Sequence, residues 1–478
     1  MTSVLPQPDP PLLDAYDGGR EVAGPVNERY SGWTIAPSGL PVGKDLWPRD
    51  IDQRNPLDPA VGWGLVLPEI PGASAAVQAT AEDAPPELRR LLAHRRGKVL
   101  RYRPNDAASL SVLSDPAADA DIALISPRMG VGAQELPKYL LIYGDPVTIP
   151  WQLQFNLNPI RCVGRLDLTG EPLARYVEAE LLDWAGAAAD CRAPVVWSVD
   201  TGGGLQRDMT TLMRRTVGLP LQKAFADDPD LDGLVYLDGS RQPALIGGLV
   251  DALASRRPAL VVTTSHGLTA PTDDPAALRA RLGTPVDQLY QPLDPAAMLQ
   301  AWQPDGAIWF AQACCSAGGN GPSVYHGLFP VAGDVGSVLF GVAGLGAAIA
   351  PLPRALLGAE KPLRAFVGRV EPTFSWSLRD QLTGAALTSD LVEAIYRRLF
   401  LGYPVGMALE PFFAPISAIL QQYLQATGRY NDDAGPAGAA AVARALYLKV
   451  TALDRGGLVV LGDPAVRLPL PAAPGAGG

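Results

Sequence analysis

The feature that most constrains the fold is a series of short apolar runs that alternate with segments of helical character. In the second half of the chain these runs span residues 194–199, 233–237, 259–264 and 307–311. Segments with helix-start signals, proline or aspartate followed by helix-forming residues, lie between several of them. Strands that alternate with helices at this spacing predict an α/β fold: a mostly parallel sheet with helices on both faces.

The chain is long enough, at 478 residues, for more than one domain. Residues 1–55 are rich in proline and glycine and are predicted to form an extended arm. Residues 56–190 carry a first set of strand and helix patterns, and residues 191–470 carry a second. The last segment, 471–478, contains only proline, alanine and glycine and is predicted to be disordered.

A Gly-Asp-Pro turn closes an apolar run in each half, at residues 144–146 and 462–464. A duplication of one α/β unit explains the repeat, and chance explains it as well, because three-residue matches are common. The run 161–166 is predicted to be an edge strand of the first unit. Helices are predicted in the second half at 207–217, 335–349, 391–401, 413–426 and 439–448.

Composition excludes several classes of function. The net charge of −10 argues against nucleic-acid binding, which needs basic surfaces. No basic segment followed by an apolar core begins the chain, and the run 333–349 is too short and too weakly apolar to span a membrane. Four cysteines in so long a chain do not indicate a disulfide framework. We therefore expect a cytoplasmic protein without membrane contact, in a reducing compartment that keeps thiols free.

Two apolar runs lead directly into reactive side chains. Residues 260–267 read LVVTTSHG and end at His266 and Gly267, and residues 307–318 read AIWFAQACCSAG and contain Cys314. Open parallel sheets carry their chemistry at the carboxyl ends of the strands. Two such strands side by side would bring His266 and Cys314 together.

These residues supply the parts of an acyl-transfer site. A free cysteine is mostly protonated at neutral pH, and a neighbouring imidazole can accept its proton during attack and then protonate the leaving amine. The tetrahedral intermediate needs backbone N–H donors. Gly267 allows close approach of the chain, so its amide and that of Cys314 are the predicted oxyanion donors.

The two motifs resemble those of caspase-like cysteine peptidases. Residues 312–314 (Gln-Ala-Cys) coincide with the start of the caspase cysteine motif, and His266 lies 48 positions upstream, close to the caspase spacing. Ser265-His266-Gly267 looks like the histidine motif of the same group. The sequence departs from caspases after Cys314, where it continues Cys-Ser-Ala-Gly.

The sequence also resembles bacterial CHAT-domain proteases and gingipain-like peptidases. The closing segment 461–468 (LGDPAVRL) resembles theirs, and gingipains pair a non-catalytic caspase-like subdomain with a catalytic one. The resemblance implies a non-catalytic unit over 56–190 and a catalytic unit over 191–470. It implies a cysteine endopeptidase that acts on proteins or peptides without a cofactor or metal. It also allows an activating protein or a small ligand as a regulator.

The sequence allows other catalytic residues and another function. Cys315 is the alternative nucleophile, although the Gln-Ala-Cys match favours Cys314. Cys162 and Cys191 are expected to be buried fillers. His326 is the other candidate base, and we expect it at the surface or rim. The alternative function is a catalytically silent caspase-like scaffold that acts as an interaction or regulatory module.

Specificity is less well determined by the sequence. The resemblance to caspases implies that Gln312 helps to line the primary substrate pocket. Asp200 and Asp208 could make that pocket acidic and select arginine or lysine, or they could be a turn residue and a helix-start residue. Trp376, in a Ser-Trp pair like that of the caspase substrate loop, is either a wall of the substrate groove or a core residue. Ser377 stands where caspases carry an aspartate-recognising arginine, which argues against strict aspartate specificity.

Other enzyme classes have weaker signals. There is no Gly-X-Ser-X-Gly motif for a serine hydrolase, and no His/Cys/carboxylate cluster at the spacing of zinc ligands. The glycine run at residues 202–204 follows a predicted strand, but it lacks the Gly-Lys-Ser/Thr ending of a phosphate-binding loop.

Overall fold

The computed structural model describes residues 12–16, 21–23, 51–104, 106–202, 208–381, 383–432 and 435–470. The chain divides into two compact units, Met1–Ile51 and Asp52–Gly478. In the first unit, β1 (Leu12–Tyr16) pairs antiparallel with β2 (Glu21–Ala23). Most of the arm predicted over residues 1–55, and the tail predicted over 471–478, lie outside the described residues.

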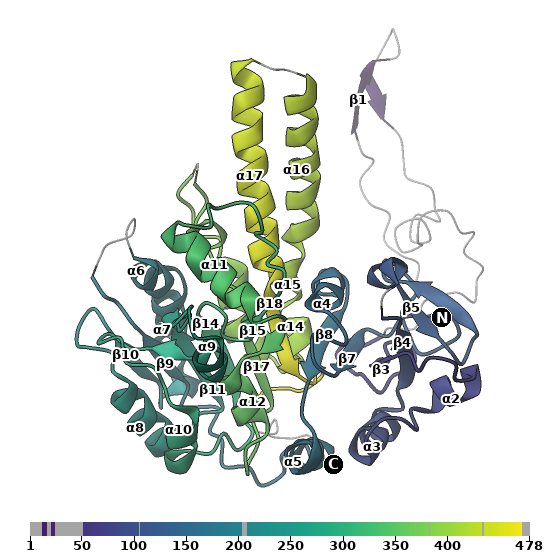
Figure 1. Ribbon diagram of the computed structural model, residues 1–478, viewed down its shortest axis with the longest axis horizontal. Coiled ribbons are helices and arrows are strands. Elements are labelled where there is room, and N and C mark those ends of the chain that lie inside the picture. Colours follow the sequence, from purple (N-terminus) through teal and green to yellow (C-terminus); the bar gives the residue numbers. More distant parts are fainter. Residues whose placement is uncertain are drawn as a thin grey trace. The chain divides into compact units, whose positions relative to one another are not determined.

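The second unit is built on a twelve-stranded sheet (Figure 1) with the order β10-β9-β11-β14-β17-β18-β8-β7-β3-β4-β5-β6. Most neighbouring strands are parallel; β18 is antiparallel to β17, and β5 is antiparallel to β4 and to β6. The predicted α/β fold with a mostly parallel sheet is confirmed. In chain order the strands are β3 (Trp63–Pro68), β4 (Lys98–Tyr102), β5 (Val112–Asp115), β6 (Ala120–Ala123), β7 (Tyr139–Tyr143), β8 (Cys162–Leu166), β9 (Val195–Ser198), β10 (Val235–Asp238), β11 (Leu260–Thr264), β14 (Ile308–Gln312), β17 (Ala365–Arg369) and β18 (Leu458–Gly462).

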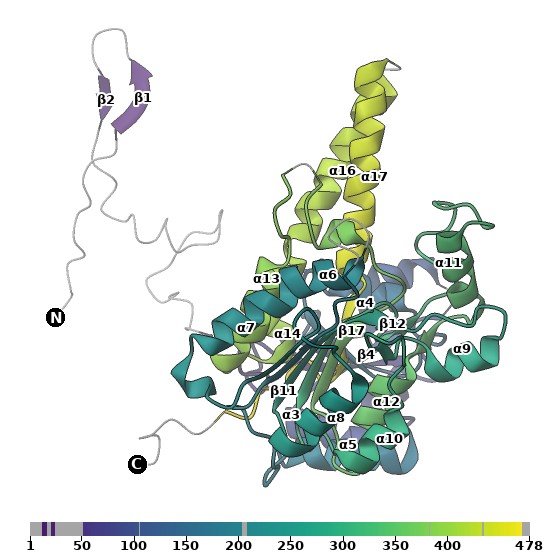
Figure 2. The same cartoon turned by 90° about the vertical axis from the view of Figure 1, so that its left-hand side faces the viewer.

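Helices flank the sheet on both sides (Figure 2). One side carries α6 (Met209–Met213), α7 (Leu219–Ala226), α13 (Ser389–Glu393) and α14 (Val405–Ala408). The other side carries α3 (Pro86–Arg95), α5 (Gly170–Leu181), α8 (Ile246–Arg256), α10 (Pro295–Ala301) and α12 (Pro351–Leu357). Because both faces are covered, the central strands are buried throughout: every residue of β11 and β14 is buried, including the polar residues at their carboxyl ends.

Apart from two long helices described below, the other helical elements are mostly seven residues long or shorter. They are α2 (Ala75–Thr80), α4 (Trp151–Leu157), α9 (Pro275–Arg281), α11 (Asp334–Gly344), α15 (Glu410–Phe413), the π-helical turns η2 (Arg214–Gly218) and η5 (Ala394–Arg398), and the 3₁₀ turns η1 (Ala107–Leu110), η3 (Pro229–Leu231) and η4 (Ser375–Ser377). Proline within the first two positions starts α3, α7, α9, α10, α12 and α15, where its missing N–H leaves no hydrogen bond unmade.

The two halves of the sequence share one sheet through the pairing of β18 with β8. These strands run parallel, with Val460 opposite Gly164 and Leu461 opposite Arg165. A Cβ at Gly164 would lie 2.1 Å from the Gly462 carbonyl oxygen, so only glycine allows this approach. The prediction that 161–166 is an edge strand is wrong, because β8 lies between β7 and β18. Every residue of β8 is buried, as expected of an interior strand. The sequence of β8 does not show which strands lie beside it.

A buried polar cluster stabilises this junction around the second Gly-Asp-Pro turn. The Asp463 carboxylate accepts a hydrogen bond from Trp63 Nε1 at 3.1 Å and forms an ion pair with Arg95 at 3.0 Å. Arg95 also pairs with Glu180 at 2.9 Å. Burial by itself would raise the pKa of Asp463, but the Arg95 charge holds it below its usual range. The last strand is therefore joined to β3, α3 and α5 of the first half.

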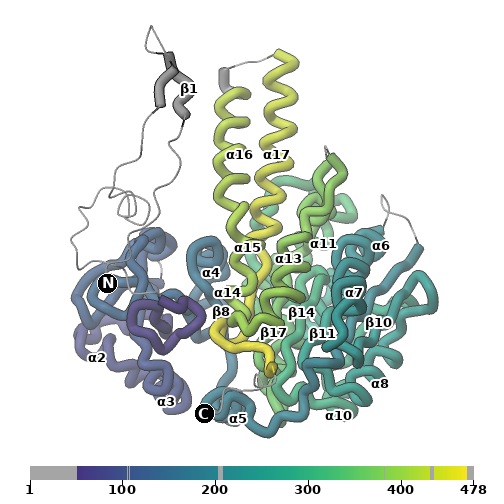
Figure 3. Tube along the Cα trace, turned by 180° about the vertical axis from the view of Figure 1, so that it is seen from behind, coloured from purple at the N-terminus to yellow at the C-terminus, as the bar shows by residue number. Residues whose placement is uncertain are grey.

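Two long helices, α16 (Pro415–Asp432) and α17 (Pro436–Gly456), form a hairpin that projects from the sheet (Figures 1 and 3). The predicted ranges are 413–426 and 439–448; α16 begins two residues later and continues through 427–432 (TGRYND), and α17 is extended at both ends, by 436–438 (PAG) and by 449–456 (KVTALDRG). The segments beyond 426 and 448 each contain a glycine, which is a poor helix former and is typical of a helix end. Although α17 has 21 residues, neither it nor any other helix in the described ranges is long and apolar enough to cross a membrane.

One predicted helix has the wrong extent, and some elements of the structure were not predicted. The helix predicted over 335–349 ends at Gly344, and Ala348–Ile349 instead forms β16, which pairs with β15 (Gly318–Gly319). A helix over the whole range would require Gly346, whose φ is +72°, to adopt a helical backbone. Strands β5 and β6 and helix α12 carry patterns too short to identify.

Candidate active site

The register of β11 and β14 places the two predicted catalytic residues beside each other. The strands are parallel, with Thr264 opposite Gln312, and the Ser265 amide donates to the Gln312 carbonyl at 3.3 Å. His266 and Cys314 each lie two residues beyond these paired ends. Both therefore stand at the carboxyl edge of the sheet, where open α/β folds bind ligands.

Gly267 packs against the backbone of Cys314. His266–Gly267 forms the short strand β12, which pairs antiparallel with β13 (Pro285–Val286). A Cβ at Gly267 would lie 1.9 Å from the Cys314 carbonyl oxygen and 3.1 Å from its nitrogen. Only glycine fits there. The Cys314 amide makes no hydrogen bond to another described residue, which leaves it available as a donor.

The His266 ring contacts a carboxylate. Its Nε2 atom lies 3.6 Å from Asp208 Oδ1, and the imidazole is nearly half exposed whereas the Asp208 side chain is almost fully covered. Asp208 follows β9 in the sequence and begins helix α6 as its N-cap residue. Sequence reasoning assigned Asp208 to a substrate pocket or a helix start. It found the helix start and missed the contact with His266.

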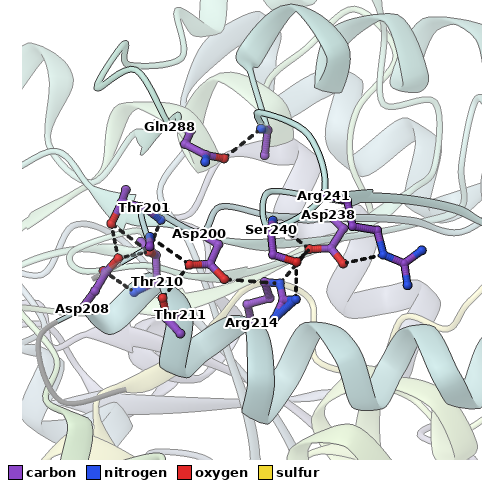
Figure 4. Close-up of polar contacts among 12 residues, drawn as sticks. Asp200, Thr201, Asp208, Thr210, Thr211, Arg214, Asp238, Ser240, Arg241 and Gln288 are labelled. Atoms are coloured by element: carbon purple, nitrogen blue, oxygen red, sulfur yellow. Dashed lines mark hydrogen bonds and ion pairs between the residues drawn. The ribbon is translucent and has the colours of Figure 1, made fainter. Parts of the chain in front are cut away.

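Asp208 is held in place by a set of hydroxyl and amide donors (Figure 4). It accepts hydrogen bonds from the Thr201 hydroxyl, from Thr210 Oγ1 at 2.7 Å and from the Thr210 amide at 2.8 Å. Burial alone would raise the pKa of this carboxyl, but these bonds and the nearby His266 hold it below its usual range. Asp208 is therefore a fixed anion beside the imidazole.

The Cys314 thiol is half-buried and faces the segment that follows β17. Its Sγ atom accepts a hydrogen bond from the Thr373 amide at 3.4 Å and lies 3.9 Å from Thr373 Oγ1. Burial raises the pKa of the Cys314 thiol, and the contacts with Thr373 partly oppose that effect. The thiol form therefore dominates at neutral pH in this arrangement, and a base is needed to activate it.

Cys315 has a different environment. It is fully buried, its backbone is left-handed with φ of +55°, and its amide donates to the Glu371 carbonyl at 3.0 Å. Burial raises the pKa of its thiol well above the usual value. A substrate reaches Cys314 more easily than Cys315, which supports the preference for Cys314.

The two reactive side chains have separate partners in this structure. The Cys314 thiol contacts Thr373, the His266 ring contacts Asp208, and no hydrogen bond joins the two side chains. Their backbones are adjacent, because each follows one of two neighbouring parallel strands. A Cys/His dyad would need a hydrogen bond between these two side chains, and this arrangement does not contain it.

Asp200, the other predicted pocket acid, is compensated by a cation. Its carboxylate accepts from Thr211 Oγ1 at 2.5 Å and lies 3.5 Å from Arg214 Nε, which also binds Asp238 at 2.7 Å (Figure 4). Asp200 and Asp208 thus lie in one cluster at the end of β9. Because Arg214 neutralises part of the charge of Asp200, Asp208 is the less compensated of the two anions.

Gln312 is closed off from the surface, and Trp376 packs against helix α17. The Gln312 side chain is fully buried, and its Oε1 atom lies 3.5 Å from Arg369 Nη2. Trp376 is half-buried and packs against Tyr447 of α17, with ring centroids 5.8 Å apart. Ser377 is buried and donates to the Phe374 carbonyl at 3.0 Å.

A buried network under Cys314 was missed by sequence reasoning. Asp454, near the end of α17, accepts a hydrogen bond from the Phe374 amide at 3.1 Å, next to the Thr373 amide that binds Cys314. Arg369 donates to the Asp454 carbonyl at 2.5 Å. The signals that could have identified it are charged residues at 369, the last position of a buried strand, at 371 just beyond that strand, and at 454 near the end of α17.

Glu371 connects Cys315, the residue after Cys314, to the loop that follows. Its side chain is buried and accepts from the Val324 amide at 3.2 Å, while its carbonyl accepts from the Cys315 amide. Burial raises the pKa of this carboxyl to about 6, and hydrogen bonds from Ser323, Val324 and Asn320 limit the rise. His326, in the same loop, is exposed, as predicted for a rim residue.

The described residues contain no group of three or more His, Cys, Asp or Glu side chains arranged to hold a metal ion. Cys162 and Cys191 are buried and free, as predicted for filler residues. Comparison with known proteins found no matching family model, no matching curated protein and no matching solved structure.

Proposed function

We propose that this protein is a cysteine endopeptidase of the caspase-like, CHAT or gingipain type, with Cys314 as nucleophile and His266 as general base. The observation that carries the proposal is the β11–β14 register, which sets His266 beside Cys314 and Gly267 against the Cys314 carbonyl. We also propose the caspase-like form of the α/β fold, with a non-catalytic unit over 56–190 and a catalytic unit over 191–470. In support, each half contributes six strands to the sheet.

In the proposed mechanism His266 removes the proton from Cys314 Sγ as the sulfur attacks the carbonyl carbon of a peptide bond. The amides of Gly267 and Cys314 stabilise the resulting oxyanion. The intermediate collapses to a thioester as His266 returns the proton to the leaving amine. Water, deprotonated by His266, then hydrolyses the thioester and restores the thiol. Asp208 orients the imidazole and stabilises its protonated form.

The proposed substrate is a protein or peptide, and the residue preferred at the cleaved bond is not determined. Asp208 and Asp200 lie at the end of β9, in reach of the same edge of the sheet, and an acidic pocket there would favour arginine or lysine. The partial neutralisation of Asp200 by Arg214 weakens that preference. A digest of a defined peptide library by the purified full-length protein measures it directly.

A silent scaffold is the second candidate, and one observation favours it. The Cys314 thiol is bound to Thr373 rather than to His266, and burial keeps it protonated. A chain that never leaves this arrangement would bind partners without cleaving them. A latent enzyme that an activating protein or small ligand switches on would look the same in its resting state.

Covalent labelling separates these functions. The full-length protein is treated with a peptidyl electrophile, which reacts only at a working site, and the modified residue is identified by mass spectrometry. The enzyme requires labelling that is lost in Cys314→Ala and in His266→Ala but kept in Cys315→Ala and in the remote control Cys191→Ala. Equal labelling of the Cys314→Ala and Cys315→Ala variants would contradict the assignment. Labelling of Cys314 by iodoacetamide alone, in the absence of peptidyl labelling, would favour the scaffold.

A further inference from the structure

The segment that follows β17 joins the Cys314 thiol to helix α17. The Thr373 amide donates to Cys314 Sγ at 3.4 Å, and the next amide along the chain, that of Phe374, donates to Asp454 Oδ2 at 3.1 Å. Asp454 lies in the last turn of α17. Since only two rotatable backbone bonds separate consecutive amides, the carboxylate that binds the second amide restricts the direction of the first.

The Asp454 carboxylate has little freedom to move. Its side chain is 2% exposed, and its Oδ1 atom lies 3.9 Å from Arg369 Nη1. Arg369 is also buried; it donates to the Asp454 carbonyl at 2.5 Å and lies over the Phe412 ring, 5.5 Å from the ring centroid. Close packing keeps buried side chains of this kind in one rotamer. Asp454 is therefore a fixed acceptor for the Phe374 amide.

Aromatic contacts locate the same segment but do not set the direction of its amides. The Phe374 ring packs against Tyr325 and Phe329, with centroids 4.9 and 5.6 Å apart. The Trp376 ring packs against Tyr447 of α17, with centroids 5.8 Å apart. These contacts act through side chains, whereas the hydrogen bond to the carboxylate acts on the amide itself and depends on its direction.

The Thr373 amide can stabilise a negative charge on the sulfur, because a hydrogen bond to the charged form of a group favours that form. Burial raises the pKa of the Cys314 thiol, and the hydrogen bonds from Thr373 are the strongest influence that opposes the rise. The Asp454 charge raises the same pKa and the Arg369 charge lowers it, each by less.

Two further titratable groups feel the charge of Cys314. Burial raises the pKa of the Tyr325 hydroxyl and the pKa of the Cys315 thiol well above their usual values, so both groups stay neutral at neutral pH. The charge of Glu371 contributes to both rises. Neither group therefore adds a charge beside the sulfur.

We propose that Asp454 is a positioning residue for Cys314. It holds the Phe374 amide and thereby keeps the preceding amide, that of Thr373, directed at the sulfur. This donor stabilises the thiolate that forms when His266 removes the proton. The inference rests on the proposed role of Cys314 as nucleophile, and it makes helix α17 a structural part of the site.

Alkylation of Cys314 by iodoacetamide in the full-length protein tests the proposal. The reagent reacts with the thiolate, so the dependence of its rate on pH reports the pKa of the thiol. Fragment-ion mass spectrometry separates Cys314 from the neighbouring Cys315. The reagent needs neither His266 nor a bound peptide, so the measurement does not depend on peptidase activity.

Two variants separate the hydrogen bond of Asp454 from its charge. Asp454→Asn removes the charge and keeps a side-chain oxygen for the Phe374 amide, whereas Asp454→Leu removes both. We expect a higher pKa of Cys314 in Asp454→Leu, so that alkylation at neutral pH is about 10-fold slower than in Asp454→Asn. Asp454→Ala gives the same comparison if the leucine variant does not fold.

Tyr447→Phe is the matched control on the same helix. It removes the hydrogen bond from the Tyr447 hydroxyl to Asp380 at 2.8 Å and keeps the ring that packs against Trp376. Its alkylation rate should match that of the wild type at every pH, because the Asp454 contact is intact. Equal profiles in Asp454→Asn and Asp454→Leu, or a loss in Tyr447→Phe as large as that in Asp454→Leu, would overturn the proposal.

The result is distinguishable from a failure of the proposed function. A chain that cleaves no peptide but is alkylated more slowly in Asp454→Leu than in Asp454→Asn would contradict the peptidase and support the inference. A chain that cleaves peptides and is alkylated equally in both variants would support the peptidase and contradict the inference. A Cys314 thiol that stays unreactive in Asp454→Asn at every pH would contradict the inference as well.

Discussion

His266 Nε2 lies 3.6 Å from Asp208 Oδ1, and the carboxylate in that contact is also the N-cap of helix α6. One side chain thus begins a helix and fixes an imidazole beside Cys314. Because hydroxyl and amide donors already hold the Asp208 carboxylate in one orientation, binding the ring costs no further side-chain entropy of Asp208.

We predict that Asp208→Asn lowers kcat/KM by at least about 10-fold, with the main effect on kcat, because the amide no longer stabilises a protonated imidazole. Asparagine is also a good N-cap, so the melting temperature should stay near that of the wild type. Steady-state hydrolysis of the best peptide from the library digest measures the effect. Asp294→Asn, at the N-cap of α10, is the control and should retain full activity. An unchanged kcat in Asp208→Asn would remove Asp208 from the mechanism.

Gly267→Ala is expected to lower kcat about 100-fold or more. The new Cβ would lie 1.9 Å from the Cys314 carbonyl oxygen, so the strand must move and the predicted oxyanion donors separate. Gly248→Ala, in helix α8 with nothing within 4 Å of the added carbon, should be neutral or slightly stabilising. Full activity in Gly267→Ala would show that the oxyanion site lies elsewhere.

The buried Glu371 should make stability depend on pH. Its pKa rises from the ordinary glutamate value of 4.5 to about 6 in the folded protein, so its contribution to stability is fully present below pH 4.5 and is lost as the pH rises through 6. The ionised carboxylate then costs about 2 kcal/mol at neutral pH. Glutamine does not ionise, so the unfolding free energy of wild type minus that of Glu371→Gln should fall by that amount between pH 4 and pH 7.5.

Denaturant unfolding at both pH values checks this prediction. The exposed Glu360→Gln is the control and should show no comparable change. A difference between wild type and Glu371→Gln that stays constant with pH would mean that Glu371 does not titrate in this range.

Arg95→Met should destabilise the protein by about 3–5 kcal/mol, because Asp463 and Glu180 would remain as buried carboxylates without a cation. Thermal and denaturant unfolding measure the loss. Arg90→Met is a control on the same helix: its pair with Glu178 is more than half exposed on both sides, so its removal should cost less than about 1 kcal/mol. Similar losses in the two variants would contradict a role for Arg95 at the junction of the halves.

The fold class was accessible from the sequence because periodicity and chain order are local properties. The apolar runs at 259–264 and 307–311 correspond to β11 and β14, and the alternation with helices predicts parallel strands. Which strands lie side by side in the sheet is not a local property of the sequence. The place of β8 beside β18 depends on residues about 300 positions apart and on the fit of Gly164 against Gly462, which no pattern within either segment reveals.

The candidate site shows the same difference between what local sequence patterns predict and what contacts between distant segments decide. The sequence by itself determined which residues carry reactive groups, since His266 and Cys314 each follow a buried strand and Gly267 follows the histidine. Only the tertiary structure decided their partners. The contacts of Asp208 with His266, Thr373 with Cys314 and Arg214 with Asp200 each join segments brought together by sheet pairing and helix packing. Burial decided that Gln312 lies under the site, because a side chain at a strand end is covered or open only according to the helices that pack above it.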